Sequence, residues 1–128
     1  MSFICPQCGS QSLEIVRSLE FPGDASSDEI ALQQITCARC GLRGAAVYRE
    51  SRRGRLDTES WDHSGYSLDD DDYRRLDERM RTCPNPTARD CVCEAHLFLN
   101  RRDSHGIWHG LAGFHLPTPF NMISAQKL

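Results

Sequence analysis

Three stretches in the first half of the chain carry a strand-like pattern of apolar and polar positions. Residues 13–21 place an apolar side chain at every second position except at Arg17. Residues 30–36 and 45–50 are shorter apolar stretches, and the first of them runs directly into Cys37. Because the side chains of a strand alternate between the two faces of its sheet, the pattern predicts three half-buried strands.

A helical period replaces this alternation in residues 67–81. Tyr73, Leu76 and Met80 recur at spacings of three and four, which is typical of the narrow buried stripe of a surface helix. Ser67 is the expected N-cap, four aspartates follow in the first turn, and arginines occupy the last turn. We interpret the acidic run as helix-stabilising charge rather than a metal site, since adjacent side chains of a helix point in different directions.

The breaks between these patterns divide the chain into three parts. Residues 1–56 contain the three predicted strands, and residues 57–82 contain an aromatic-rich linker without a clear period followed by the helix. A Cys-Pro-Asn-Pro sequence ends the helix, and residues 83–128 form a unit rich in cysteine and histidine. We therefore expect a small α+β protein with an N-terminal three-stranded ribbon, one central helix and a C-terminal unit of short strands and turns.

Two copies of the motif Cys-x-x-Cys-Gly flank the first two predicted strands. Cys5 and Cys8 belong to the first copy, and Cys37 and Cys40 to the second. Two intervening residues let both sulfurs of a turn point at one ion, and the following glycine supplies the left-handed conformation that closes the turn. Two such turns complete a tetrahedron, so these four cysteines are the first predicted metal site.

Over roughly residues 3–50 the chain resembles the zinc-ribbon, or rubredoxin-like, family, and the two motifs carry that resemblance. The resemblance implies a small three-stranded sheet with a structural Zn(II) at one end. Rubredoxins bind iron in a similar site, but this chain departs from them in the long insert between the motifs and in the arginine-rich segment that follows. We therefore expect zinc rather than iron.

A second site is predicted from the remaining cysteines and one histidine. Cys83, Cys91 and Cys93 use up the cysteines of the chain, and His96 follows Cys93 by three residues. Three sulfurs and an imidazole would close a second tetrahedron around zinc. The seven cysteines thus point to two zinc ions rather than to disulfides, which are rare in a reducing compartment.

Two alternatives to this second site remain open from the sequence. In the first, His105, His109 or His115 replaces His96 as the fourth ligand. In the second, water occupies the fourth corner, and Glu94 acts as a general base beside a metal-bound hydroxide. The second alternative would make the chain a metal-dependent hydrolase-type enzyme.

Charge and hydropathy narrow the possible partners. The net charge of −3 argues against a protein that coats nucleic acid with a uniformly basic surface. The sequence still contains a local group of arginines, and in the nucleic-acid-binding alternative these side chains contact phosphates. They are Arg39, Arg43, Arg49, Arg52, Arg53 and Arg55. The sequence contains neither a run long enough for a membrane span nor the regions of a signal peptide, so a cytoplasmic location is expected.

The function expected from these features is that of a zinc-binding accessory or adaptor protein. In this interpretation, structural zinc stabilises a module that docks onto a larger enzyme or assembly, because the sequence lacks a nucleotide-binding loop and a nucleophile motif. A nucleic-acid-binding zinc ribbon and the hydrolase described above are the two alternatives.

Overall fold

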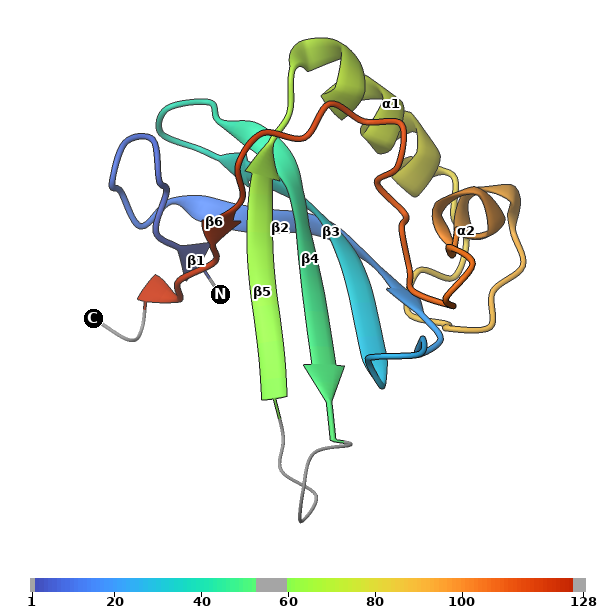
Figure 1. Cartoon of the computed structure of the whole chain (residues 1–128). Helices are drawn as coiled ribbons and strands as arrows, with labels where there is room; N and C mark the ends of the chain where they lie inside the picture. Colours follow the sequence, from blue (N-terminus) through green and yellow to red (C-terminus); the bar gives the residue numbers. More distant parts are fainter. Residues whose placement is uncertain (1, 53–59, 126–128) are drawn as a thin grey trace.

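The computed structural model describes residues 2–52 and 60–125, which form a curled antiparallel sheet with two helices against one face (Figure 1). The six strands follow the order of the chain, and each pairs with the next. They are β1 (Ser2–Phe3), β2 (Leu13–Phe21), β3 (Glu29–Cys37), β4 (Arg43–Ser51), β5 (Ser60–Ser67) and β6 (Phe120–Asn121). Four long central strands thus lie between two very short outer ones.

The two outer strands meet at one end of the sheet, which closes that end into a half-barrel. Phe3 of β1 forms an antiparallel bridge with Ser124, just beyond β6. The amide of Ile4 also donates to the carbonyl of Ile123 over 2.9 Å. Figure 1 shows β1 and β6 side by side at this end, whereas the opposite ends of β4 and β5 extend away from them. The N-terminal and C-terminal parts of the chain therefore share one sheet.

The three predicted strands are confirmed as β2, β3 and β4, and the irregularity at Arg17 has a structural cause. The register between β2 and β3 shifts between Ile15 and Arg17, which is the signature of a β-bulge. The bulge lets Arg17 reach toward the helix side of the sheet, where its Nη1 lies 2.9 Å from Oδ1 of Asp77. Arg17 thus interrupts the apolar alternation of β2 at the position where this strand forms an ion pair with a helix.

The expectation of a linker before the helix is wrong for residues 60–66, because they belong to β5. This strand pairs with β4 along its whole length, from Ser51 opposite Ser60 to Gly44 opposite Ser67. Its sequence does not alternate, since mostly polar or small side chains occupy both faces. Gly65 is buried under Phe120, and a Cβ at this position would meet that ring at 2.5 Å. Residues 57–59 lie outside the described part of the chain.

The structure contains two helices among the described residues, where one was expected. The first, α1 (Asp70–Arg81), buries the predicted stripe, but its N-cap is Asp69 rather than Ser67. The second, α2 (Glu94–Leu99), is a six-residue helix in the region where only short strands and turns were expected. No helix in the described residues is long and apolar enough to span a membrane. The described chain is therefore mostly β, with two helices.

Two hydrophobic clusters lie on opposite faces of the sheet. The larger cluster packs β2, β3 and β4 against α1, α2 and the segment containing Trp108, Leu111 and Phe114. The smaller cluster lies inside the closed end of the half-barrel and includes Phe3 and Met122 together with buried Cys5 and Cys37. The first cysteine group therefore forms part of a core that joins the two ends of the sheet.

Candidate metal centres

The first cysteine group is built from two turns with matching hydrogen bonds. In the first turn, the Gly9 amide donates to the Cys5 carbonyl over 2.8 Å, and Gly9 has a φ of 73°. In the second, the Gly41 amide donates to the Cys37 carbonyl over 3.0 Å, and Gly41 has a φ of 81°. Positive φ is what glycine allows without strain. The repeated motif thus folds into a repeated turn, as the sequence predicts.

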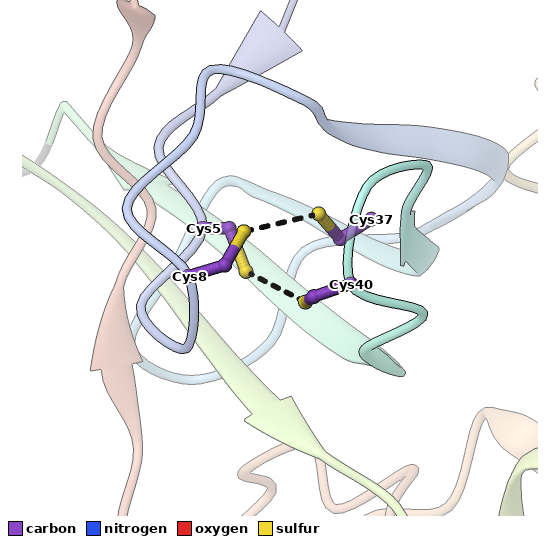
Figure 2. A group of neighbouring side chains, drawn as sticks. All are labelled: Cys5, Cys8, Cys37 and Cys40. Atoms are coloured by element: carbon purple, nitrogen blue, oxygen red, sulfur yellow. Dashed lines mark hydrogen bonds between the residues drawn. The ribbon is translucent and has the colours of Figure 1, made fainter.

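The four sulfurs of these turns converge on one point at the closed end of the sheet (Figure 2). Sγ of Cys5 lies 3.6 Å from Sγ of Cys40, and Sγ of Cys8 lies 3.8 Å from Sγ of Cys37. Zinc–sulfur bonds of about 2.3 Å in a tetrahedron place sulfurs about 3.8 Å apart. The spacing of the sulfurs therefore suits an ion at their centre, and the four cysteines could hold a metal such as zinc.

The surroundings of the first group set different pKa values for its thiols. The amide of Cys40 donates to Cys37 and, with other donors, lowers the pKa of Cys37 to about 6. Ser10 lowers the pKa of Cys8 through a hydrogen bond of 3.1 Å between Oγ and Sγ. The Leu42 amide acts to lower the pKa of Cys40, but burial and the neighbouring thiols raise it to about 12. At neutral pH, the lowered pKa of Cys37 thus favours its thiolate, which is the form that binds a metal ion.

The second group lies where the end of α1, the loop after it and the start of α2 meet. Cys83 follows α1, Cys91 lies in the loop, and Cys93 is the N-cap of α2, accepting from the His96 amide. The sulfurs of Cys83 and Cys91 are 3.9 Å apart. Nδ1 of His96 lies 3.0 Å from Sγ of Cys83 and 3.6 Å from Sγ of Cys93. The structure thus brings all four predicted donors together, and they too could hold a metal ion.

The orientation of His96 is fixed by its second nitrogen. Nε2 lies 3.0 Å from the carbonyl oxygen of Glu20 in β2. A carbonyl only accepts hydrogen bonds, so Nε2 carries the proton and Nδ1 presents its lone pair to the sulfurs. The side chain is buried and its ring lies 5.2 Å from that of Phe21. Sequence reasoning did not find this contact with β2, because a backbone carbonyl leaves no signal in a motif.

Burial and hydrogen bonding act in opposite directions on the thiols of the second group. Burial raises the pKa of Cys83 to about 11. Burial also acts to raise the pKa of Cys93, but the hydrogen bond from the His96 amide, together with the neighbouring thiols, lowers it to about 7. Cys93 therefore loses its proton more readily than Cys83.

The other candidate ligands of the second site lie elsewhere. Nε2 of His109 lies 3.1 Å from Oδ2 of Asp103, and Nδ1 of His115 lies 3.2 Å from Oδ2 of Asp72. His105 is an exposed residue outside the group of converging ligand atoms. The side chain of Glu94 is 93% exposed and lies 3.9 Å from Nη1 of Arg79. Among the described residues, His96 is thus the histidine that faces the three sulfurs.

A third convergence of ligand atoms involves Asp69, Asp72 and His115. Oδ1 of Asp69 accepts from the Asp72 amide over 2.7 Å as the helix cap. Asp72 accepts from Nη1 of Arg75 at 2.9 Å and from the His115 amide at 2.8 Å, and these contacts lower its pKa. Its carboxylate therefore has protein partners, which agrees with the helix-stabilising interpretation of the acidic run.

Three of the six arginines considered for phosphate binding have acidic partners in the structure. Arg43 pairs with Asp70, Arg49 with Asp24, and Arg52 with both Glu29 and Glu50. Arg39 is exposed in the second cysteine turn. Arg53 and Arg55 lie outside the described residues. The described arginines therefore do not form a patch of unneutralised positive charge.

Compared with known protein families, curated proteins and solved structures, the chain matches none of them. The identity of the two metal centres consequently depends on their geometry and donor chemistry alone. Those observations support two cysteine-rich groups, each of which could hold an ion such as zinc.

Proposed function

We propose that this chain is an adaptor protein whose N-terminal part is a zinc ribbon and whose fold is held by two structural zinc ions. The observation that carries the proposal is that each group offers four protein donors, four sulfurs in one and three sulfurs with one imidazole in the other. A structural zinc site is closed by four protein ligands, whereas a catalytic zinc keeps a position for water. The two groups therefore favour a scaffold over an enzyme.

The positions of the two groups support a structural role. The first joins the turn after β1 to the turn between β3 and β4, and its buried cysteines extend the smaller hydrophobic cluster. The second joins the ends of α1 and α2 and contacts β2 through His96. Because a chain of 128 residues builds only a modest core, ions at these junctions would contribute much of its stability.

An exposed apolar surface beside the closed end of the sheet supports the adaptor part of the proposal. Trp61 of β5 is 57% exposed and Ile123, beyond β6, is 48% exposed. Both line a hollow of about 330 Å³ that also contains His63 and Met122. A large aromatic side chain beside a hollow is a common anchor of protein interfaces. We propose that a partner protein covers this surface.

The metal part of the proposal is tested by native mass spectrometry and zinc-edge absorption spectroscopy on the intact protein. Two zinc ions with an average of about 3.5 sulfurs and half a nitrogen each are expected. A site with a bound water, or a Glu94→Gln protein that keeps its zinc and loses a hydrolytic activity, would contradict the structural assignment. A Cys91→Ser protein should lose the second zinc and keep the first.

The adaptor part is tested by photo-crosslinking in cells of the source organism. A photoreactive amino acid at Trp61 should give one discrete protein adduct, and Ile123→Ser in the same chain should remove it. The matched control places the photoreactive group at Val92, which is 75% exposed and lies near the second group. Equal adducts from both positions, or none from Trp61, would contradict a partner on this surface.

A further inference from the structure

A groove on the helix side of the sheet has the dimensions of a ligand site. It has a volume of about 520 Å³ and runs between β5 and the segment of residues 107–116. Pockets for small organic ligands usually measure about 300–1,000 Å³ and combine apolar walls with a few polar groups. The groove lies away from both cysteine groups and shares only Asp62 with the lining of the hollow beside Trp61, so neither the metal centres nor the proposed adaptor surface accounts for it.

The two walls of the groove differ in chemistry. Asp62, Ser64 and Tyr66 stand at alternate positions of β5 and line one wall. Alternate positions share a face of the sheet, so these three polar groups form a row along the strand. The facing wall is apolar and includes Leu111 and Leu116, the latter 41% exposed. A ligand that fills the groove therefore needs one polar edge and one hydrophobic side.

Hydrogen bonding leaves the polar wall rich in acceptors. Oγ of Ser64 donates its proton to Oδ2 of Asp62 over 3.0 Å, so the lone pairs of Ser64 and the second oxygen of Asp62 remain as acceptors. Within the described chain, the hydroxyl of Tyr66 makes no hydrogen bond. A ligand that supplies hydrogen-bond donors would satisfy these groups.

The charge of the groove is also uneven. Arg49 lines it, but its Nη1 lies 3.0 Å from the fully buried carboxylate of Asp24, and its Nη2 donates to the Trp108 carbonyl over 2.9 Å. His109 at the rim lies 3.1 Å from Asp103. The basic groups Arg49 and His109 thus already have acidic partners, whereas the Asp62 carboxylate accepts a hydrogen bond from the uncharged hydroxyl of Ser64. The groove therefore favours a cation over an anion.

We propose that this groove binds apolar amines, in which a protonated amino group is attached to a flat or branched hydrophobic body. The amino group would lie against Asp62 and Ser64, and the body would lie between Tyr66 and the leucines of the facing wall. The same chemistry occurs in a free arylalkylamine and in a lysine side chain next to an aromatic residue of a peptide. We assign the groove to the free amine, because its two walls fit one small ligand with a single charge.

The first experiment is a nuclear magnetic resonance titration of the zinc-loaded full chain with three indole probes of similar shape. Tryptamine carries an ammonium group, 3-ethylindole has no charge, and indole-3-propionate carries a carboxylate. Tryptamine should bind most tightly and shift the amides of Ser64 and Gly113, whereas indole-3-propionate should bind weakest. Equal or stronger binding of the carboxylate probe would overturn the proposal. The peptide acetyl-Phe-Lys-amide is a fourth probe, and tighter binding of this peptide than of tryptamine would overturn the assignment to a free amine.

Three variants separate the contributions of the walls. Asp62→Asn should weaken tryptamine binding about tenfold, the loss expected for one charged contact at a partly exposed site, and leave 3-ethylindole unchanged. Tyr66→Phe should keep the fold, since its hydroxyl has no hydrogen-bond partner among residues 2–52 and 60–125, and should weaken tryptamine binding about threefold or more. Ala112 is exposed at the groove, and Ala112→Trp should fill it and abolish binding of every probe. Undiminished tryptamine binding by both Asp62→Asn and Ala112→Trp would place the ligand elsewhere and overturn the proposal.

Discussion

His96 and Glu20 connect the second cysteine group to the central sheet. Nε2 of His96 donates to the Glu20 carbonyl over 3.0 Å, and the Glu20 amide in turn donates to the Pro86 carbonyl over 2.9 Å. The loop that carries Cys83 and Cys91 is therefore hydrogen-bonded to the same residue of β2 that orients the imidazole. An ion at this site would couple the helices to the sheet.

Replacing His96 should remove the metal ion of the second group and weaken the packing of α1 and α2 against the sheet. The His96→Ala protein is expected to hold one zinc ion and to be less stable, by about 4 kcal/mol at a free zinc concentration one thousand times the dissociation constant. Native mass spectrometry measures the metal, and chemical denaturation measures the stability. The control is His105→Ala, because His105 is exposed and outside the group. A His96→Ala protein with two zinc ions and unchanged stability would contradict this assignment.

Removing one thiol from the first group should destabilise the closed end of the sheet, where the two cysteine turns lie. Cys8 is the exposed member of the group, so Cys8→Ser changes packing little and acts through the metal. We expect loss of the zinc and faster amide exchange in residues 3–15 and 35–44, because metal binding at such sites is coupled to folding. Hydrogen exchange followed by mass spectrometry measures the effect. Retained zinc with unchanged thermal stability would exclude the predicted coupling.

The carboxylate of Asp24 should make stability depend on acid pH. It accepts from the amides of Trp108 at 2.8 Å and Ser27 at 2.7 Å and pairs with Arg49. Burial acts to raise the pKa of Asp24, but these donors lower it well below the ordinary value of 3.8. The charged group therefore stabilises the fold above pH 3.8, and this contribution falls as the pH decreases through the folded pKa.

The corresponding variant is Asp24→Asn, which keeps the size of the side chain and removes its charge. At pH 7 it should be less stable than wild type by roughly 3 kcal/mol, since a buried charge pair loses one partner. The difference between the two proteins should shrink as the pH falls below 3.8, which denaturation of both proteins at matched pH values would show. A difference that stays constant with pH would mean that the charge of Asp24 does not contribute.

Gln34 should act as the polar link between the sheet and α1. Its side chain is buried, and Nε2 donates to Oδ1 of Asp77 at 2.7 Å and to the Tyr73 hydroxyl at 2.9 Å. The Gln34→Leu protein should be less stable by about 2 kcal/mol, because it removes the donor to the Tyr73 hydroxyl and one of the donors to Asp77, and leaves Arg17 without the Gln34 acceptor. The pKa of Asp77 should rise, since Gln34 is the largest cause of its lowered value. Carboxyl titration by nuclear magnetic resonance measures that pKa, and Gln11→Leu is the exposed control.

The sequence allowed the parts of the fold that depend on local pattern to be predicted. The three alternating stretches became β2 to β4, the stripe of Tyr73, Leu76 and Met80 became the buried side of α1, and the four donors of each predicted metal group lie together. Each of these features is encoded by residues close to one another in the chain or by a repeated motif with its own turn geometry. Such patterns can be recognised in the sequence because a strand, a helix or a cysteine turn needs particular residue types at fixed spacings.

The features that were missed depend on distant contacts. β5 carries no alternating pattern, since its place in the sheet is set by pairing with β4 and by Phe120 over Gly65. The closure of the sheet joins Phe3 to Ser124, and the residues involved form no motif. The cap at Asp69 was missed because a run of four aspartates offers several capping positions and only the direction of the chain after β5 selects one.

The spacing of the donors along the chain also bears on the order in which metal would be captured. The donors of the second group span 13 residues, from Cys83 to His96, whereas those of the first span 35, from Cys5 to Cys40. Closing the longer loop in an unfolded chain costs about 0.9 kcal/mol more entropy. The second group therefore gathers its ligands at the lower entropic cost, and formation of the hairpin of β2 and β3 would bring the two turns of the first group together. During synthesis at the ribosome, in contrast, the first group emerges earlier, so a chain refolding from denaturant and a nascent chain should load their two ions in opposite orders.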